Sequence, residues 1–475
     1  MIHIPILRAG RSYKSLTTVD VPHVKGGEPV ARVSQANQGL IAKDLHSVDQ
    51  NWRALEALTV SELLVICKEA AQLFAETELP LDGASQSPDD YVHCLSATTG
   101  MPESLCWKNM AKIRVVLEEL EAILGGLTRG LDLSVLDEGW GVQDGRHLSY
   151  VPQTEALGAV LPNNSPGVHA LWIPAVALKT PLILKPGSLE PWTPFRISQA
   201  LIEAGCPMEA FGFYPTDYSG SSEILLRSGR SMLFGGGTTV SPWKTDSRVQ
   251  IHGPGQSKII LADDTIAGWE DYADLMVASV AENGGRSCIN ASGVWVPSDG
   301  KEVAEALASR LSRIEARPLD DPEAGIAAFP NPEVAHHMSN LIDSHLKVPG
   351  ATDITAMVRG TERLAQVDGC TFLLPTVIWC EDWQHPLANT EFLFPFVSVV
   401  EVPQTAMLER IGPTLVVTAI TENRKFRRDL TNSLAVDRLN LGPIPTNQIS
   451  WDQPHEGNLF DFLYQQRALQ IEPRR

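Results

Sequence analysis

The segment LGAVLPNNSPGVHALWIPAVALKTPLILK, residues 157–185, contains two short apolar runs separated by a turn and a helix-length stretch. The runs, 157–161 and 182–185, have the length of buried strands. The turn at 162–166 consists of proline, asparagine and serine, which favour turns. A strand, a helical crossover and a second strand predict two parallel neighbours in an α/β sheet.

The same pattern continues along the chain. Further strand-length apolar runs, separated by stretches long enough for helices, occur at 210–214, 231–234 and 258–261. A second region of this kind follows residue 288. Such alternation predicts parallel sheets covered by helices on both faces.

The length of the chain, 475 residues, exceeds that of one ordinary domain. We predict one domain from residues 1–130 and 152–253, and a second domain from residues 254–444. Alternating apolar residues interrupted by glycines predict a hairpin across 131–151. With the tail, 445–475, this hairpin is expected to form a small bridging or oligomerisation element.

The net charge is −19, from 57 acidic and 38 basic residues. Such a surface repels phosphate backbones, so a nucleic-acid partner is not expected. No stretch approaches the roughly 20 apolar residues that a membrane span needs. The seven cysteines form no C-x-x-C pair and have no metal-ligand spacing. We therefore expect reduced thiols, a location in the cytoplasm and no metal site.

Cys288 differs from the other six cysteines in its setting. It lies on a predicted loop between a helix at 271–281 and a strand at 291–296, and Asn283-Gly284-Gly285 would end the helix. A cysteine on a glycine-flanked loop can be exposed and reactive, whereas a cysteine within an apolar run usually packs in the core. Arg286, two residues before, is expected to lower the pKa of the thiol.

The segment Asn283-Gly284-Gly285-Arg286-Ser287-Cys288 resembles the N-x-G-x-x-C motif around the nucleophile of the aldehyde dehydrogenase superfamily. Four other segments resemble motifs of that family in the family's order: Leu161-Pro162-Asn163-Asn164-Ser165-Pro166, Leu184-Lys185-Pro186-Gly187-Ser188 with Thr193-Pro194, Phe234-Gly235-Gly236-Gly237-Thr238, and Glu391-Phe392-Leu393-Phe394-Pro395. The resemblance is densest over residues 155–290. It implies an NAD(P)-dependent oxidoreductase with a cofactor domain, a catalytic domain and a small β bridging element, assembled as a homodimer or homotetramer.

The chemistry of these residue types agrees with the resemblance. The Cys288 thiolate can add to a carbonyl carbon, which creates an oxyanion. The side-chain amide of Asn164 and the backbone N–H of Cys288 are the expected donors to that oxyanion. Loss of hydride to a nicotinamide then leaves a thioester on Cys288.

The resemblance also assigns the cofactor site, to Leu161, Pro162, Lys185, Ser188, Gly236, Gly237 and Glu391. In the family, a glutamate three residues after the lysine shares the cofactor ribose, and Ser188 stands at that position. A carboxylate repels a 2′-phosphate and serine does not, so we expect NADP to be tolerated as well as NAD. Glu190 is close enough in sequence to replace the missing carboxylate.

The clearest departure from the family is His252-Gly253-Pro254-Gly255-Gln256, where hydrolytic members have E-L-G-G-K. The glutamate that activates water is therefore replaced by His252. Its loss resembles the CoA-acylating, acyl-CoA reductase-like branch, in which CoA resolves the thioester. On this ground the sequence favours an acylating enzyme that acts on an aldehyde or an acyl-CoA.

Two alternatives remain open at this stage. A neutral histidine can act as a general base near physiological pH, so His252 could support a hydrolytic aldehyde dehydrogenase. The chain could instead be a catalytically idle relative that only binds nucleotide. The joint presence of Cys288, Asn164, Lys185 and Glu391 argues against that last alternative.

Overall fold

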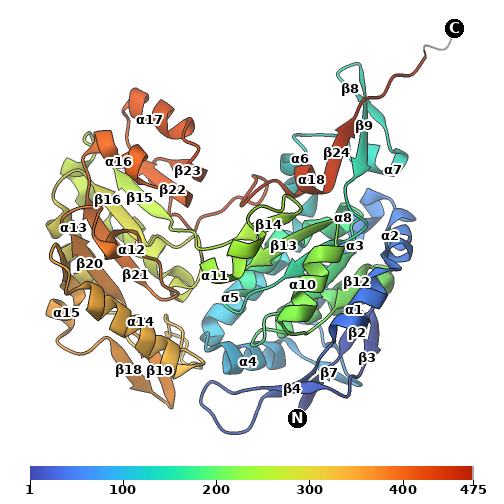
Figure 1. The fold of residues 1–475 in the computed structure, drawn as a ribbon, viewed down its shortest axis with the longest axis horizontal. Helices are drawn as coiled ribbons and strands as arrows, with labels where there is room; N and C mark the ends of the chain where they lie inside the picture. The colour runs from blue at the N-terminus through green and yellow to red at the C-terminus, as the bar shows by residue number, and fades with distance from the viewer. Residues whose placement is uncertain (473–475) are drawn as a thin grey trace.

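A computed structural model describes residues 1–472 and shows two lobes, each built on a seven-stranded sheet (Figure 1). The strands of the first sheet, in spatial order, are β14 (Val249–His252), β13 (Arg230–Phe234), β10 (Leu157–Val160), β11 (Leu182–Lys185), β12 (Phe211–Phe213), β2 (Ile6–Arg8) and β3 (Arg11–Tyr13). The five strands from β14 to β12 are parallel, and β2 and β3 add an antiparallel edge.

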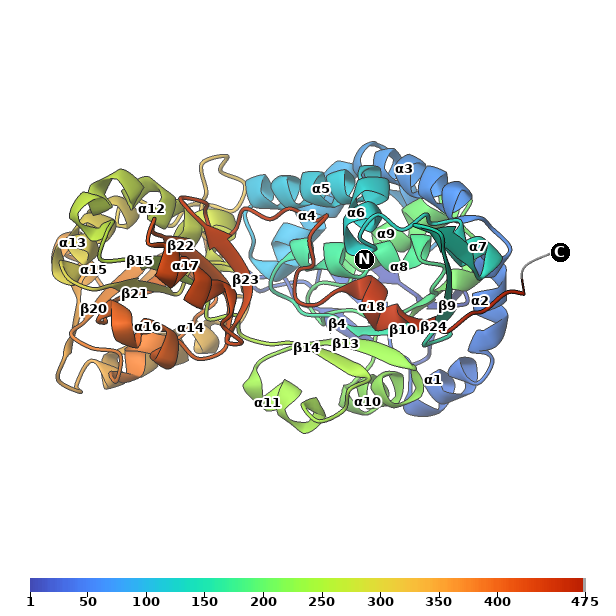
Figure 2. The same cartoon turned by 90° about the horizontal axis from the view of Figure 1, so that it is seen from above.

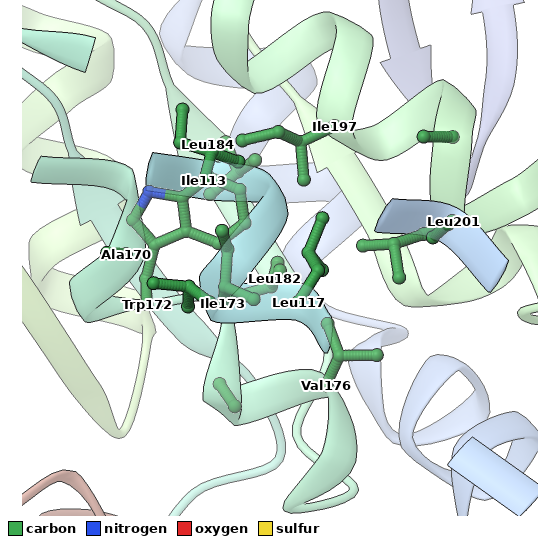
Figure 3. Close-up of a cluster of buried hydrophobic side chains, with 14 of the residues drawn as sticks. Ile113, Leu117, Ala170, Trp172, Ile173, Val176, Leu182, Leu184, Ile197 and Leu201 are labelled. Carbon is green, nitrogen blue, oxygen red and sulfur yellow. The ribbon is translucent and has the colours of Figure 1, made fainter. Parts of the chain in front are cut away.

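Strand β11 shows why helices cover both faces of this sheet. Side chains alternate between the faces of a strand, and Leu182 and Leu184 join the larger hydrophobic core while Ile183 joins a smaller one. Figure 3 shows Leu182 and Leu184 packed beside Ile113, Trp172 and other apolar side chains of that larger core. The helices over the larger core are α3 (Val60–Glu76), α5 (Glu103–Glu118) and α9 (Trp192–Glu203), and those over the smaller are α1 (Gln38–Leu45) and α10 (Tyr218–Arg227).

The second sheet has the same design. Its strands, in spatial order, are β17 (Ala351–Asp353), β20 (Thr376–Cys380), β21 (Phe396–Glu401), β16 (Gly293–Val296), β15 (Lys258–Leu261), β22 (Thr414–Ile420) and β23 (Val436–Leu441). All neighbours are parallel except β17 and β20. The covering helices are α12 (Ala273–Ala281) and α13 (Gly300–Leu311) on one face, and α14 (Pro332–His345), α16 (Gln404–Arg410) and α17 (Arg424–Thr431) on the other.

The C-terminal segment connects the two lobes. It leaves the second sheet after β23 and crosses to the first lobe, where β24 (Tyr464–Arg467) pairs with β9 (Arg146–Pro152) (Figures 1 and 2). Strand β8 (Gly141–Gln143) completes this small sheet. The crossing segment passes between the lobes, which places its residues near both sheets.

Shorter elements complete the architecture. They are α2 (Val48–Glu56), α4 (Pro88–Thr99), α6 (Leu120–Leu127), α7 (Val135–Glu138), α8 (Pro174–Ala177), α11 (Gly237–Val240), α15 (Ile354–Arg359), α18 (Leu459–Leu463), β1 (Ile2–Ile4), β4 (Thr18–Val21), β5 (Ala31–Ser34), β6 (Leu79–Leu81), β7 (Ala84–Gln86), β18 (Leu364–Val367) and β19 (Cys370–Leu373). Among residues 1–472, no helix is both long and apolar enough to cross a membrane.

The predicted α/β architecture with two mainly parallel sheets and a small β element is confirmed, but one local prediction is wrong. The alternating run at 131–136 is no strand: residues 133–134 form a turn, and Val135 begins the short helix α7, which Gly139 ends with a left-handed φ of 72°. The hairpin is formed by β8 and β9 alone. The N-terminal region also contributes to the first sheet, because β2 pairs with β12 and β3 pairs with β2.

Candidate active site

The loop that carries Cys288 is shaped by three consecutive residues with positive φ, Asn283, Gly284 and Gly285. They follow the end of α12 and reverse the direction of the chain. At Gly285 a side chain is excluded outright, because a Cβ would lie 2.4 Å from the backbone nitrogen of Pro395. Ser257, just before β15, donates to the Cys288 carbonyl at 2.8 Å and fixes the loop against the second sheet.

Cys288 lies where two cavities meet. A cleft of about 720 Å³ extends from Cys288 along the carboxyl ends of the first sheet's strands. A second cavity of about 290 Å³ is lined in part by the crossing segment, including Trp451 and Glu456. Cys288 and Val168 line both cavities, so a group bound in either one can reach the thiol.

The nearest titratable partner of the thiol is Glu456, from the crossing segment. The Cys288 Sγ donates to Glu456 Oε1 at 3.5 Å, and Glu456 Oε2 is paired with His252 Nδ1 at 2.5 Å. The ring of His252 stacks on Phe234 at a centroid distance of 4.3 Å. Both the Glu456 and His252 side chains are buried, so a carboxylate braced by a histidine is held against the nucleophile.

Glu456 is a candidate functional residue that the sequence did not reveal. It lies 168 residues after Cys288, in chain that has no motif or periodicity to mark it. Its position is fixed by tertiary contacts: the side-chain amide of Gln250 in β14 donates to its carbonyl. The nearest local signal is Asn458, two residues after Glu456, which is the N-cap of α18. This signal marks the start of a helix and does not point to Glu456 itself.

The pKa of the Cys288 thiol is not lowered by Arg286, contrary to the expectation from the sequence. Burial raises the pKa of Cys288 well above its usual value, and the carboxylates of Glu456 and Glu391 raise it further. Arg286 does not counter this, because its guanidinium donates to the carbonyls of Thr99 and Ala328. A thiol with a raised pKa needs a base before it can act as a nucleophile. Burial raises the pKa of Glu456, but the charge and hydrogen bond of His252 outweigh it and hold that pKa below its usual value.

Asn164 also lines the cleft beside Cys288. One hydrogen of its amide is donated to the Arg286 carbonyl at 3.0 Å, which ties the 162–166 turn to the nucleophile loop. An amide group has two hydrogens, so one remains for a substrate oxygen. In the described part of the chain no residue accepts from the Cys288 backbone N–H, so this second donor is free as well.

The cleft has features that fit a dinucleotide. Leu161, Pro162, Lys185, Gly236 and Glu391 all line it, and β11 ends at the cleft with Lys185 as its last residue. Next to Gly236 and Gly237, at the start of α11, nothing lies within 4 Å of where a Cβ would stand. The backbone N–H groups there are accessible to an anionic group. Leu225, Leu233 and Trp243 supply apolar walls for a planar base.

Two cofactor expectations need adjustment. Glu190 is not free to contact a ribose, because its carboxylate is buried and accepts from the Thr193 backbone N–H and hydroxyl and pairs with His169 Nε2 at 2.9 Å. Ser188 is exposed at the rim of the cleft, where Asn163 Nδ2 donates to its hydroxyl at 3.4 Å. No carboxylate therefore occupies the position of the family's ribose-binding glutamate.

The sequence profile of the aldehyde dehydrogenase family matches residues 12–410. The chain belongs to the aldehyde dehydrogenase family. The predicted resemblance and the predicted fold are therefore confirmed, and the chain is an oxidoreductase of the NAD(P)-dependent type.

Solved aldehyde dehydrogenases share the fold along their whole length. The aldehyde dehydrogenase KauB of Pseudomonas aeruginosa is 17% identical, with 100% of this chain and 97% of that chain covered and a TM-score of 0.79. An NAD-dependent aldehyde dehydrogenase of Sinorhizobium meliloti is 16% identical, with 100% and 96% covered and a TM-score of 0.76. An NADP-dependent enzyme of E. coli is 16% identical, with 98% of each chain covered and a TM-score of 0.75.

His455, beside Glu456, gives a prediction for stability against pH. Burial lowers the pKa of His455 to about 4, from an ordinary value of 6.5. Between those values the unfolded chain binds a proton that the folded chain excludes, so stability decreases as pH falls from 6.5 to 4. The difference between these two pKa values corresponds to a loss of about 3 kcal/mol in the free energy of unfolding across that window. In His455→Gln the fall in melting temperature between pH 7 and pH 5 should be clearly smaller than in the wild type. An equal fall in both proteins would mean that His455 is not the responsible group.

Proposed function

We propose that this family member oxidises a small aldehyde and releases a carboxylic acid by hydrolysis of a thioester on Cys288. The observation that carries the proposal is the contact of the Cys288 thiol with Glu456, a buried carboxylate braced by His252. A base at this place can take a proton from the thiol and later from water. This contact favours hydrolysis over the acylating outcome, which the histidine at position 252 favours in the sequence.

In the first half-reaction the Cys288 S–H bond breaks and its proton moves to the Glu456 carboxylate. The sulfur forms a bond to the carbonyl carbon, and the carbonyl oxygen becomes an oxyanion. The Cys288 backbone N–H and the free hydrogen of the Asn164 amide stabilise that charge. A nicotinamide cofactor, when bound, supplies the hydride acceptor. Lys185, Gly236 and Glu391 are the residues that would hold it.

In the second half-reaction Glu456 takes a proton from water while the water oxygen attacks the thioester carbon. The C–S bond breaks, the acid leaves, and Cys288 regains its proton. Glu456 lines the 290 Å³ cavity, through which it can return its first proton to solvent. His252 acts through Glu456 by orienting the carboxylate and keeping it ionised, which makes His252 a positioning residue in this proposal.

The test compares aldehyde oxidation by the wild type with and without free CoA. Hydrolysis predicts full turnover without CoA, with carboxylic acid as the product. The second candidate, an acylating enzyme, is favoured by the absence of a carboxylate at position 252. It predicts poor turnover until CoA is added, with acyl-CoA as the product, and that result would overturn the hydrolytic proposal.

Asn164→Ala should lower the rate constant of the chemical step by about 10²–10³, the range for loss of one oxyanion donor. The reason is that, in this proposal, the second amide hydrogen donates to the developing oxyanion. Single-turnover formation of reduced cofactor measures this step. An unchanged rate constant would show that Asn164 only holds the 162–166 turn against the Arg286 carbonyl.

Ser188→Glu should weaken the binding of NADP about tenfold more than the binding of NAD. The new carboxylate would stand at the rim of the cleft near Lys185 and repel a 2′-phosphate. The ratio of kcat/KM for the two cofactors measures the effect, and Ser188→Gln is the matched neutral control. If both variants change kcat/KM equally for the two cofactors, Ser188 does not face the ribose. Tolerance of NADP is thus part of the proposal.

Assembly and location are also proposals. The family membership supports a homodimer or homotetramer, and the exposed edge of β23 offers an unpaired strand for a neighbouring subunit. All seven cysteines are free thiols, which supports a reducing compartment such as the cytoplasm.

A further inference from the structure

The 290 Å³ cavity is the place where the substrate would approach Cys288, and its lining is not uniform. Close to the nucleophile, the polar side chains are buried and already paired. Asn109 Nδ2 donates to the Leu105 carbonyl and to Asn283 Oδ1, and Asn290 Nδ2 donates to two backbone carbonyls. Amides whose hydrogen bonds are satisfied hold the walls in place and offer little to a ligand.

Apolar side chains form another part of the lining. They are half-buried and come from three different parts of the chain: Val168, Leu171, Ile289, Ile449 and Trp451. Such walls suit an alkyl chain. At roughly 30 Å³ per water, the volume of about 290 Å³ corresponds to about ten waters, which matches an aldehyde of five or six carbons with a polar end.

Two charged residues of the cavity, Lys112 and Glu282, are different from the rest. Within residues 1–472 neither side chain has an ion-pair partner or a hydrogen bond. The other carboxylate, Glu456, is paired with His252, and burial keeps His455 neutral by lowering its pKa to about 4. Lys112, which is exposed, and Glu282, which is half-buried, therefore add one positive and one negative charge without a protein partner to the lining.

Local geometry places these two charges near one another. Lys112 follows Asn109 by three residues on α5, so the two lie on one face of the helix. Glu282 directly precedes Asn283. Asn109 Nδ2 and Asn283 Oδ1 are 2.6 Å apart, so this hydrogen bond joins the two segments that carry Lys112 and Glu282. Gln448, exposed and without a side-chain hydrogen bond in the described chain, adds an amide to the same cavity.

We propose that the substrate is an amino-acid semialdehyde, an aldehyde whose far end carries both an ammonium and a carboxylate group. Glu282 would accept the ammonium and Lys112 the carboxylate, while the alkyl chain lies along the apolar walls and the aldehyde carbon reaches Cys288. This inference rests on the proposed aldehyde oxidation. A neutral ligand would leave both charges of the cavity without partners, and a singly charged one would leave one of them.

The first test compares four aldehydes of equal chain length as substrates of the full-length enzyme: neutral, acidic, amino and zwitterionic. The zwitterionic semialdehyde should exceed each singly charged aldehyde by about tenfold in kcat/KM, since one charged hydrogen bond is worth about 1.4 kcal/mol or somewhat more. Equal kcat/KM for the neutral and zwitterionic compounds would overturn this inference alone. Failure to oxidise any aldehyde would overturn the proposed function.

Variants that each remove one charge test which residue binds the carboxylate and which binds the ammonium of the substrate. Lys112→Met should lower kcat/KM about tenfold more for the acidic than for the neutral aldehyde, and Glu282→Gln should do the same for the amino aldehyde. Lys108→Met, one turn earlier on α5 and outside the cavity lining, is the matched control and should not change these ratios. Losses of equal size for all four aldehydes in Lys112→Met and Glu282→Gln would contradict the assignment.

A readout without turnover or cofactor uses the amino acid norvaline, a zwitterion with a three-carbon side chain and no aldehyde. Norvaline should slow alkylation of Cys288 by iodoacetamide in the wild type, and more strongly than pentanoate or pentylamine at the same concentration. The advantage of norvaline should disappear in the double variant Lys112→Met, Glu282→Gln. Equal protection by all three compounds would reject recognition of both charges.

Discussion

Cys288→Ser is expected to abolish turnover, with a loss on the order of 10⁴-fold or more, as for removal of a covalent nucleophile. A serine hydroxyl is a far poorer nucleophile at neutral pH. Its size and polarity match the thiol, so the loop, the cleft and the hydrogen bond to Glu456 should persist. Steady-state formation of reduced cofactor with saturating aldehyde measures the loss.

Nucleotide binding by the same variant is the control. The residues expected to hold the cofactor lie on the first sheet and at Glu391, so the dissociation constant of NAD(P)H should change little. Cys106→Ser, at a buried cysteine with no access to the cleft, separates loss of the nucleophile from general damage. Activity of Cys288→Ser near that of the wild type would remove the central residue of the proposed mechanism.

Glu456→Gln is expected to lower steady-state turnover by about 10²–10⁴, the usual range for loss of a general base. The amide keeps the shape of the carboxylate and its place beside His252, but it cannot take a proton from the thiol or from water. The same assay as for Cys288→Ser measures the loss. An unchanged turnover number would mean that another group, or CoA itself, resolves the thioester.

His252→Gln separates a positioning role from a catalytic one. Because the charge and hydrogen bond of His252 lower the pKa of Glu456, their loss should raise that pKa. The acidic limb of the kcat–pH profile should therefore move to higher pH, with a loss at the optimum smaller than in Glu456→Gln. If His252→Gln is instead the more damaging variant and Glu456→Gln the milder one, His252 is the base and Glu456 its support.

The proposed semialdehyde substrate and the proposed mechanism use different parts of one cavity. Glu456 and His252 act at the thiol, whereas Lys112 and Glu282 would act on the far end of the substrate. Substitutions in the first pair should therefore reduce kcat with every aldehyde. Substitutions in the second pair should change the preference among aldehydes, which keeps the two sets of experiments independent.

Much of the lining of the cleft could be predicted because its signals are local. Lys185 ends a short apolar strand, and Asn164 lies in a turn defined by neighbouring prolines and asparagines. Gly284, Gly285 and Cys288 lie within five consecutive residues, and the positive φ that glycine allows is enough to turn the chain there. Such features depend on a few adjacent residues, so they can be recognised from motifs in the sequence.

The polar groups beside Cys288 could be predicted only in part. His252 was recognised because it replaces a known residue in a motif, yet its hydrogen bond to Glu456 spans 204 residues. The expected effect of Arg286 on the thiol was wrong because the side chain turns to backbone carbonyls of distant segments. The direction of a long side chain is decided by acceptors that only the folded chain brings near it.

The sequence by itself determined the α/β class, the family, the loop of the nucleophile and the strand ends that line the cleft. These follow from periodicity, turn residues and motif spacing, each set within a short stretch of chain. The tertiary structure alone decided that the segment between β23 and α18 crosses to the other lobe and places Glu456 against Cys288. It also decided that Lys112 and Glu282 share one cavity. The physical reason is that contacts between segments more than a hundred residues apart arise from the packing of whole lobes, which no local pattern records.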